Sequence, residues 1–186
     1  EYILEECLDA GVKQFIFIIS KKKMNIKKYF YNDIFYKKLI KKKKDKRIEK
    51  EYRKLKKYRK MIKFVYQNQP KGTGDAVLKC SNHIRGKYFL MLLPDDLIIK
   101  KNCTKEMIRL HKQKKGSVIG TKIVPQKDVS RWGILSFKKK KKNNFQITDV
   151  VEKPKLKDAK SNYAIIGRYI LPKKIMNEIK RLKPGE

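Results

Sequence analysis

Two short segments of the sequence carry residue types that could bind an anionic ligand and a divalent cation. The first is NQPKGTGDAVLKC, residues 68–80, in which Gly72 and Gly74 stand directly before an apolar helix pattern. Glycines let a backbone approach a ligand closely, and a helix that starts there points free N–H groups at an anion or a base edge. The second is LLPDD, where Asp95 and Asp96 follow an apolar run, and carboxylate oxygen is a ligand that Mg²⁺ prefers. An ordinary strand-to-helix turn and a polar turn after a strand explain the two segments equally well when each is taken alone.

Predicted strands precede both segments. Short runs rich in β-branched and aromatic residues predict strands at residues 14–19, 61–67, 87–93 and 117–124. Amphipathic or charged tracts between them predict helices at about 24–60, 74–82 and 104–115. The run at 87–93 is so apolar that we expect it in the middle of a sheet.

Strands that alternate with helices imply right-handed βαβ crossovers. We therefore predict an α/β fold with a doubly wound, mostly parallel, Rossmann-like sheet that has helices on both faces. Ligands of such sheets bind beyond the carboxyl ends of the strands, which is where both segments lie.

The two ends of the sequence read as helices, and its later part is rich in predicted strands. At the start, Leu4 and Cys7 share an apolar face, and Gly11 is expected to stop this helix. Three further strands are predicted at RWGILSF, FQITDVVE and NYAIIGRYI, with a lysine-rich hairpin between the first two, and PKKIMNEIKRL predicts a closing helix.

The chain is strongly basic, with 51 Lys and Arg against 18 Asp and Glu and a formal charge of +33. Such a charge favours a nucleic-acid partner in principle. Most of the cations, however, are lysines in runs, which are typical of solvated surface. At 40% apolar residues the chain can form a core, and no apolar run approaches the roughly 18 residues of a membrane span. Together with three cysteines that lack CxxC spacing, this predicts a cytoplasmic protein without a membrane partner.

Four motifs, taken in their order along the chain, indicate a family resemblance. They are Gln-x-x-x-Lys-Gly-x-Gly-x-Ala-Val-Leu from Gln67, LLPDD, VVEKP at 150–154 and NYAIIGRY at 162–169. Over essentially the whole chain, this set resembles the bacterial UTP–glucose-1-phosphate uridylyltransferases, relatives of the sugar-nucleotide pyrophosphorylases. The resemblance implies transfer of a uridylyl group from UTP to glucose 1-phosphate, which gives UDP-glucose and pyrophosphate, with Mg²⁺ as cofactor. It also implies a homo-oligomer when the protein is full length.

The resemblance also assigns roles to individual residues of the first two segments. It implies that Gln67 hydrogen-bonds the uracil edge and that Gly72 lets the backbone approach the ring. Asp95 matches the metal-binding, catalytic aspartate, and Asp96 is expected to orient the loop or a water molecule. The competing interpretation of Gln67 is an exposed polar residue at the end of a strand.

Three later residues match the sugar site of the family. Gly133 matches the glycine whose backbone meets the sugar, Glu152 the residue that holds sugar hydroxyls, and Lys153 the catalytic residue that binds the sugar phosphate. The competing interpretation of Glu152 and Lys153 is an ordinary surface ion pair. We accordingly expect one partial domain over residues 1–186, with a nucleotide-binding part at about 1–116 and a sugar-binding part at about 117–186.

The sequence departs from the family at both ends. It lacks the Gly-x-Gly-Thr-Arg loop that holds the triphosphate, and it lacks the aspartate beyond the final helix that joins the metal site. We therefore expect these 186 residues to be a fragment that binds UDP-glucose weakly and does not turn over. Two alternatives stay open: a non-catalytic remnant that binds sugar nucleotides, and a basic nucleic-acid-binding module. The second is favoured by the aromatic residues among the cations of KYRKMIKFVYQ, although burial of Phe64 and Tyr66 in a strand explains this pattern better.

Overall fold

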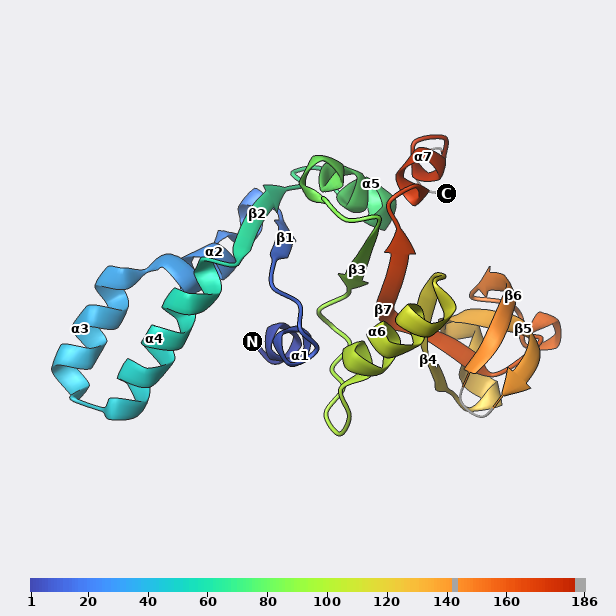
Figure 1. The fold of residues 1–186 in the computed structure, drawn as a ribbon, viewed down its shortest axis with the longest axis horizontal. Coiled ribbons are helices and arrows are strands. Elements are labelled where there is room, and N and C mark those ends of the chain that lie inside the picture. Colours follow the sequence, from blue (N-terminus) through green and yellow to red (C-terminus); the bar gives the residue numbers. More distant parts are fainter. Residues whose placement is uncertain (142–143, 183–186) are drawn as a thin grey trace. The chain divides into compact units, whose positions relative to one another are not determined.

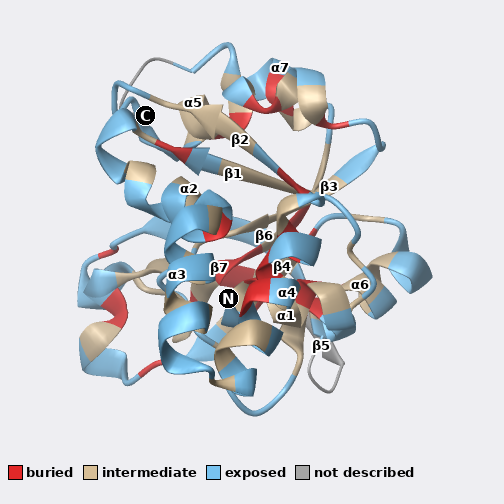
Figure 2. Ribbon diagram, turned by 90° about the vertical axis from the view of Figure 1, so that its left-hand side faces the viewer, coloured by how far each residue is buried: buried red, intermediate tan, exposed pale blue. Residues whose placement is uncertain are grey.

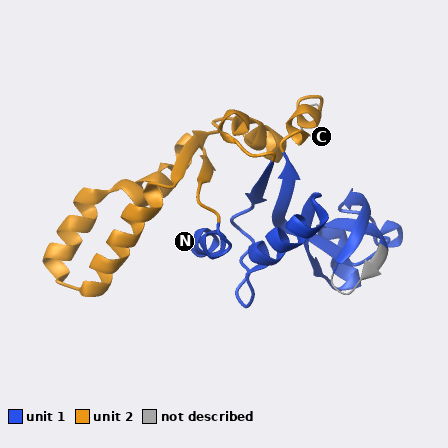
Figure 3. Ribbon diagram, viewed as in Figure 1, with its two compact units in different colours: residues 1–11, 88–172 blue, residues 12–87, 173–186 orange. Residues whose placement is uncertain are grey.

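A computed structural model describes residues 1–141 and 144–182 of the chain. Residues 142 and 143, which belong to the predicted lysine-rich hairpin, lie outside the described residues. The chain forms two compact units (Figure 3): unit 1 contains residues 1–11 and 88–172, and unit 2 contains residues 12–87 and 173–186. This division follows compactness, whereas the division predicted near residue 116 concerns roles and stays a prediction.

Unit 2 contains two parallel strands and the helices that connect and follow them (Figure 1). Its elements are β1 (Phe15–Ile19), a 3₁₀ turn (Lys21–Lys23), α2 (Met24–Tyr31), α3 (Asp33–Lys43), α4 (Lys46–Arg59), β2 (Ile62–Tyr66), α5 (Gly72–Lys79), a second 3₁₀ turn (Ser81–His83) and α7 (Ile175–Ile179). Phe17 of β1 lies opposite Phe64 of β2. Parallel strands need a long crossover connection, which here consists of α2, α3 and α4.

The helical tract predicted over residues 24–60 is divided into three helices by two capping residues. Asn32 accepts a hydrogen bond from the Phe35 N–H at 3.0 Å, and Asp45 accepts one from the Arg47 N–H at 2.8 Å. Asn and Asp are favoured at helix N-termini because their side chains satisfy N–H groups that have no partner inside the helix. The helical prediction is therefore confirmed, and its two interruptions have a local chemical cause.

Unit 1 is an antiparallel sheet with two α-helices. Its elements are α1 (Tyr2–Asp9), β3 (Tyr88–Leu92), α6 (Cys103–Lys114), β4 (Val118–Ile123), a 3₁₀ helix (Gln126–Arg131), β5 (Gly133–Lys141), β6 (Asn144–Glu152), a 3₁₀ turn (Leu156–Asp158) and β7 (Tyr163–Pro172). The predicted stop of α1 is confirmed, because Gly11 follows it with a φ of +86°. Such a left-handed conformation suits glycine, which has no Cβ.

The long strand β7 organises the sheet of unit 1. The strand order is β3-β7-β5-β6, and β4 also pairs with β7. One cluster of buried side chains joins α6, β4 and β7, and a second lies where β5 and β7 meet (Figure 2). Members of the first cluster are Met107, Val118 and Ile170, and members of the second are Val124, Val129, Ile134 and Ala164.

The predicted mixed α/β composition is confirmed, whereas the predicted mostly parallel sheet is confirmed only for β1 and β2. The strand pairs of unit 1 are antiparallel. Among the described strands of this unit, β3 stands at one end of the order and pairs with β7 alone, so its predicted place in the middle of a sheet is not what the structure shows. An apolar strand indicates that both faces of the sheet are covered at that strand. It does not indicate whether the strand has a neighbour on one edge or on both edges.

Among the described residues, no helix combines the length and the apolar character needed to cross a bilayer.

Candidate functional site

The turn after β3 contains Asp95 and Asp96, whose carboxylates differ in their hydrogen bonds. The Asp96 carboxylate accepts a hydrogen bond from the Gly167 N–H at 2.8 Å. Asp95 is exposed, and within the described part of the chain its carboxylate has no hydrogen bond or ion pair. The two carboxylates thus differ in their surroundings, since that of Asp96 is bonded to β7 and that of Asp95 is exposed, and the roles expected for them stay predictions.

A buried arginine lies beneath this turn. Arg168 of β7 has an exposed fraction of 0%. Its guanidinium donates to the carbonyls of Leu93 at 3.2 Å, Gly167 at 3.1 Å and Asp96 at 2.7 Å. The same group forms an ion pair with the Glu6 carboxylate, with 3.0 Å between Arg168 Nη2 and Glu6 Oε2. The carbonyls on both sides of Asp95 are thus held by one rigid, charged group.

The close approach of β7 to the turn requires glycine at position 167. A Cβ atom on Gly167 would lie 2.5 Å from the Leu93 Cβ and 3.0 Å from Asp96 Oδ2. Carbon atoms in contact prefer about 3.5–4.0 Å, so a side chain at this position would push the turn away from the strand.

The three residues predicted for sugar binding are brought together by the pairing of β5 with β6. Gly133 opens β5 and lies opposite Glu152, the last residue of β6. A Cβ on Gly133 would lie 3.0 Å from Glu152 Oε2, so the carboxylate stands directly over the glycine backbone. Lys153 follows at once, and its Nζ lies 3.9 Å from Glu152 Oε1 with both side chains mostly exposed.

Lys153 has an unusual backbone conformation. Its φ is +48°, which residues with a side chain rarely adopt and which costs about 1–3 kcal/mol. The Lys153 N–H donates to the Trp132 carbonyl at 3.0 Å and so ties the strained residue to the start of β5. Lys44 and Lys115 have similar φ values of +50° and +53°, where they cap the C-terminal ends of α3 and α6, whereas Lys153 adopts this conformation directly after β6.

The hydroxyl of Tyr169 has a raised pKa. Tyr169 is half-buried on β7 next to Arg168. Burial raises the pKa of the Tyr169 hydroxyl, and the negative charges of Asp96 and Glu152 raise this pKa further.

The predicted base-binding residues belong to unit 2 and form a closed local structure. Gln67 follows β2, and its N–H donates to the Ile19 carbonyl at 3.0 Å. The side-chain Nε2 of Gln67 donates to the Gly72 carbonyl at 3.1 Å and to Asp75 Oδ2 at 2.7 Å. The amide is thereby oriented by α5, with its oxygen left as the group that can accept a further hydrogen bond.

The two glycines of the Gly-x-Gly turn have different roles. Helix α5 begins at Gly72, two residues before the predicted start. Gly72 has a φ of +89°, and a Cβ there would meet no atom within 4 Å, so its backbone is open to a ligand. A Cβ on Gly74 would lie 3.0 Å from Ile179 Cγ2 of α7, so packing of the two helices explains this second glycine.

Of the residues described, no three His, Cys, Asp or Glu side chains are gathered as a metal centre made only of protein ligands would need. Mg²⁺ commonly takes only one or two protein carboxylates and completes its shell with water and substrate phosphate. The open carboxylate of Asp95 fits this kind of site, and the Asp96 carboxylate is already partly engaged by Gly167.

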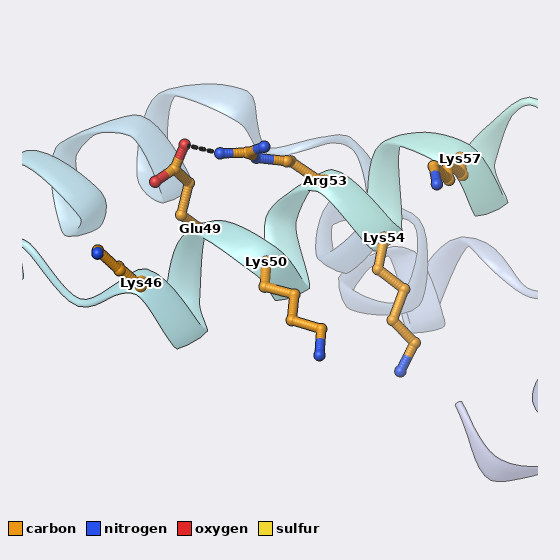
Figure 4. Close-up of a pocket in the computed structure, with 6 residues that line it drawn as sticks. All are labelled: Lys46, Glu49, Lys50, Arg53, Lys54 and Lys57. Carbon is orange, nitrogen blue, oxygen red and sulfur yellow. Dashed lines mark hydrogen bonds and ion pairs between the residues drawn. The ribbon is translucent and has the colours of Figure 1, made fainter.

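A strongly basic face runs along α4 in unit 2. Figure 4 shows its side chains along the helix, with Glu49 bonded to Arg53 and the lysine ammonium groups pointing in several directions. The face is lined by Lys46, Glu49, Lys50, Arg53, Lys54 and Lys57. Cations spaced in this way along an exposed helix agree with a solvated surface.

The aromatic residues of β2 pack inside unit 2. Phe64 meets Phe17 edge to face, with ring centroids 5.7 Å apart. The Tyr66 hydroxyl accepts a hydrogen bond from Lys27 Nζ at 3.1 Å. Both rings are half-buried, so they do not form the open stacking surface that single-stranded nucleic acid needs.

A sequence profile described as Nucleotidyl transferase matches residues 1–186. The chain belongs to this nucleotidyl transferase family. The chain is 34% identical over 190 residues to a protein of Methanocaldococcus jannaschii that is provisionally named UTP–glucose-1-phosphate uridylyltransferase. It is 33% identical over 191 residues to the UTP–glucose-1-phosphate uridylyltransferase of Mycoplasma pneumoniae. The two matches cover 100% of this chain but 65% and 64% of the relatives, so the chain spans just under two thirds of their length.

Solved structures of similar proteins include complexes with nucleotides. A UTP-bound UGPase of Acinetobacter baumannii matches with a TM-score of 0.89 and 27% identity, covering 100% of this chain and 67% of that chain. A UDP-glucose pyrophosphorylase complexed with UDP-glucose matches with a TM-score of 0.82 and 29% identity, covering 99% of this chain and 67% of that chain. The resemblance inferred from the sequence motifs is therefore confirmed.

Three residues that shape the site were not assigned a role from the sequence: Gly167, Arg168 and Glu6. A signal for one of them was present, because an arginine inside the otherwise apolar run NYAIIGRYI is rarely buried without an anionic partner. The partner could not be identified from the pattern, since Glu6 is separated from Arg168 by 162 positions.

Proposed function

We propose that this nucleotidyl transferase serves uridylyl transfer from UTP to glucose 1-phosphate, with UDP-glucose and pyrophosphate as products. The observation that carries the proposal is the pairing of Gly133 with Glu152, which places a glycine backbone, the carboxylate above it and the Lys153 ammonium side by side. A bare backbone accommodates the face of a sugar ring, a carboxylate accepts hydrogen bonds from hydroxyls, and an ammonium pairs with a phosphate. The relatives named above support the same function.

In the proposed reaction, a phosphate oxygen of glucose 1-phosphate attacks the α-phosphorus of UTP. The bond from that phosphorus to the bridging oxygen of the β-phosphate breaks, and pyrophosphate leaves with the electron pair. Both reactants are anions, so the chain must mainly position them and offset their charge. Lys153 would hold the phosphate of the sugar, and its fixed backbone would keep the ammonium beside the Glu152 carboxylate that holds the hydroxyls.

Base selection is assigned to Gln67 and Gly72. Because Gln67 Nε2 is engaged by Asp75 and by the Gly72 carbonyl, its oxygen is the atom left to face a base. An amide oxygen accepts a hydrogen bond from the N3–H of uracil, whereas N3 of cytosine carries no hydrogen. A polar edge left unpaired is costly, and this cost would favour uridine nucleotides over cytidine nucleotides.

The proposed cofactor is Mg²⁺ at Asp95, where a bound cation would offset phosphate charge. We also propose a cytoplasmic location, which the three free cysteines support. The doubly wound arrangement of the nucleotide-binding part remains a proposal that the parallel pair β1–β2 supports. The homo-oligomer expected for the full-length protein and the division of roles near residue 116 stay predictions.

Calorimetry with UDP-glucose on the purified 186-residue chain tests the proposal. Binding is expected, and Gln67→Ala should weaken it about fivefold, since a hydrogen bond contributes about 1 kcal/mol. Gln69→Ala, a change at an exposed residue of the same loop, is the matched control and should bind as the unmodified chain does. CDP-glucose should bind more weakly than UDP-glucose.

A folded sample that gives no heat at millimolar UDP-glucose would refute the proposed ligand. If the same sample bound an oligonucleotide with an affinity that falls steeply with salt, the nucleic-acid module would replace it. A coupled pyrophosphate-release assay on the same sample tests the separate prediction that these 186 residues do not turn over.

A further inference from the structure

Arg168 is a charged residue in the interior of an apolar strand, and every nitrogen of its side chain has a partner. Nε and Nη2 contact the two oxygens of Glu6 at 3.4 and 3.0 Å. Nη1 and Nη2 also donate to the backbone carbonyls of Leu93, Gly167 and Asp96. Burial of a guanidinium costs free energy. A fully buried and fully paired arginine therefore indicates that its contacts have a specific structural role.

The Glu6 carboxylate is itself held in place. Its Oε1 accepts hydrogen bonds from the Thr104 hydroxyl at 2.6 Å and from the Thr104 N–H at 3.1 Å. Asn102, which caps α6, donates to the Glu6 carbonyl at 2.8 Å. The anion that orients Arg168 is therefore anchored to the start of α6, and this anchoring fixes the direction in which the guanidinium points.

The pattern of contacts to the turn is selective. The carbonyls of Leu93 and Asp96, on either side of Asp95, are bound by one planar group. The Asp96 carboxylate is bound by the Gly167 N–H. Asp95 is the acidic residue of the turn whose carboxylate stays open within the described part of the chain.

We infer that the Glu6–Arg168 pair is a positioning device for Asp95: it fixes the turn through its backbone and so presents the Asp95 carboxylate to a divalent cation. The inference rests on the proposed function, which assigns the cation to Asp95. Arginine suits the role because its rigid fork can bind two carbonyls and a carboxylate at once, whereas a lysine ammonium is a single point on a flexible stem. Arg168 acts through the turn and is not itself expected to touch substrate.

The test compares Arg168→Lys with the unmodified 186-residue chain in two measurements. The first is amide hydrogen exchange over residues 93–97, which should become faster in Arg168→Lys because the carbonyl contacts are lost. The second is the affinity for Mn²⁺ at saturating UDP-glucose, followed by water-proton relaxation. This affinity should fall about 10- to 100-fold, as is typical when a residue that supports a metal ligand is changed.

Two further variants make the result decisive. Arg109→Lys, at an exposed residue of α6 in the same unit, is the matched control and should change neither measurement. Glu6→Gln keeps the shape of the anchor but removes its charge, and it replaces Arg168→Lys in both measurements if circular dichroism shows that the lysine variant does not fold. Both variants of the pair are expected to loosen the turn.

The possible failures are distinguishable. If Arg168→Lys folds and leaves both hydrogen exchange at the turn and Mn²⁺ affinity unchanged, the positioning role is wrong. If Asp95→Asn leaves Mn²⁺ affinity unchanged, the metal assignment of the proposed function is wrong, and hydrogen exchange alone then decides whether the pair holds the turn. Loss of Mn²⁺ affinity without faster exchange at residues 93–97 would also overturn the inference, since the effect would not pass through the turn.

Discussion

Replacement of Gly167 by alanine is expected to destabilise unit 1 markedly, although it adds only one methyl group. The new Cβ would lie 2.5 Å from the Leu93 Cβ, which is about 1 Å closer than carbon atoms in contact prefer. Neither Cβ can rotate away, because each is bonded directly to its backbone. The strand or the turn must therefore move.

The expected cost follows from the contacts that such a movement breaks. Overpacking costs about 1–3 kcal/mol. The hydrogen bond from the Gly167 N–H to the Asp96 carboxylate adds about 1.5–3 kcal/mol if it is lost. Alanine also lowers the conformational entropy of the unfolded chain, and this stabilises the folded chain by about 0.4–1 kcal/mol. We expect a net loss of about 2–3 kcal/mol in the free energy of unfolding, since relaxation spares part of the contacts.

Urea unfolding followed by the fluorescence of Trp132 measures this loss, because the chain has one tryptophan and it lies in unit 1. A loss of this size lowers the urea midpoint by about 1 M. Gly116→Ala is the matched control in the same unit: the nearest heavy atom to its Cβ would be 3.9 Å away, and its φ is outside the left-handed region. That variant should equal the unmodified chain to within about 1 kcal/mol. A Gly167→Ala chain as stable as the Gly116→Ala chain would refute the close approach of β7 to the turn.

Two further outcomes are expected. Glu152→Ala should weaken binding of glucose 1-phosphate and leave UTP binding nearly unchanged in calorimetry, because the carboxylate is assigned to sugar hydroxyls; equal weakening of both ligands would show that the sugar pocket is elsewhere. The stability of the chain should also depend on pH through Glu6. Burial raises the pKa of Glu6, but the hydrogen bonds from Arg168 and Thr104 and the charge of Arg168 lower it by more. The pKa of Glu6 therefore lies below its ordinary value of 4.5. The stabilisation that Glu6 provides is then complete above 4.5 and is lost as the pH falls through the lowered pKa. Urea unfolding of Glu6→Gln should show a weaker dependence on pH in this acidic range, and an identical dependence would contradict the assignment.

Local patterns were sufficient to predict the strands and helices but not the way in which strands pair. The run FIFII predicts β1 because β-branched and aromatic residues suit a covered strand, and Gly11 stops α1 because only glycine takes a φ of +86° without strain. The partners of β3 could not be predicted, because pairing depends on residues far away in the sequence. For the same reason, the register that sets Gly133 opposite Glu152 could not be predicted, although the family resemblance assigned both residues to one sugar site.

In the candidate site, too, local patterns predict single residues but not the contacts between residues that are far apart in the sequence. Asp95 and Gly72 stand out by type and by position after a strand, so sequence patterns alone draw attention to them. The different surroundings of Asp95 and Asp96 depend on a hydrogen bond from Gly167, which no pattern around residue 95 contains. The packing role of Gly74 likewise depends on Ile179, more than a hundred positions further along the chain.

The ion pair between Glu6 and Arg168 also bears on the order in which the chain folds. Its partners are 162 positions apart, and unit 1 is assembled from residues 1–11 and 88–172, with most of unit 2 inserted between them. Closing a long loop costs entropy before any contact repays it, and distant contacts slow folding. During synthesis, β1 and β2 can pair once residue 66 has left the ribosome, whereas α1 must wait for β7 before its glutamate meets an arginine. Helix α1, which precedes both of these strands in the sequence, is therefore among the later parts of the described chain to reach its final surroundings.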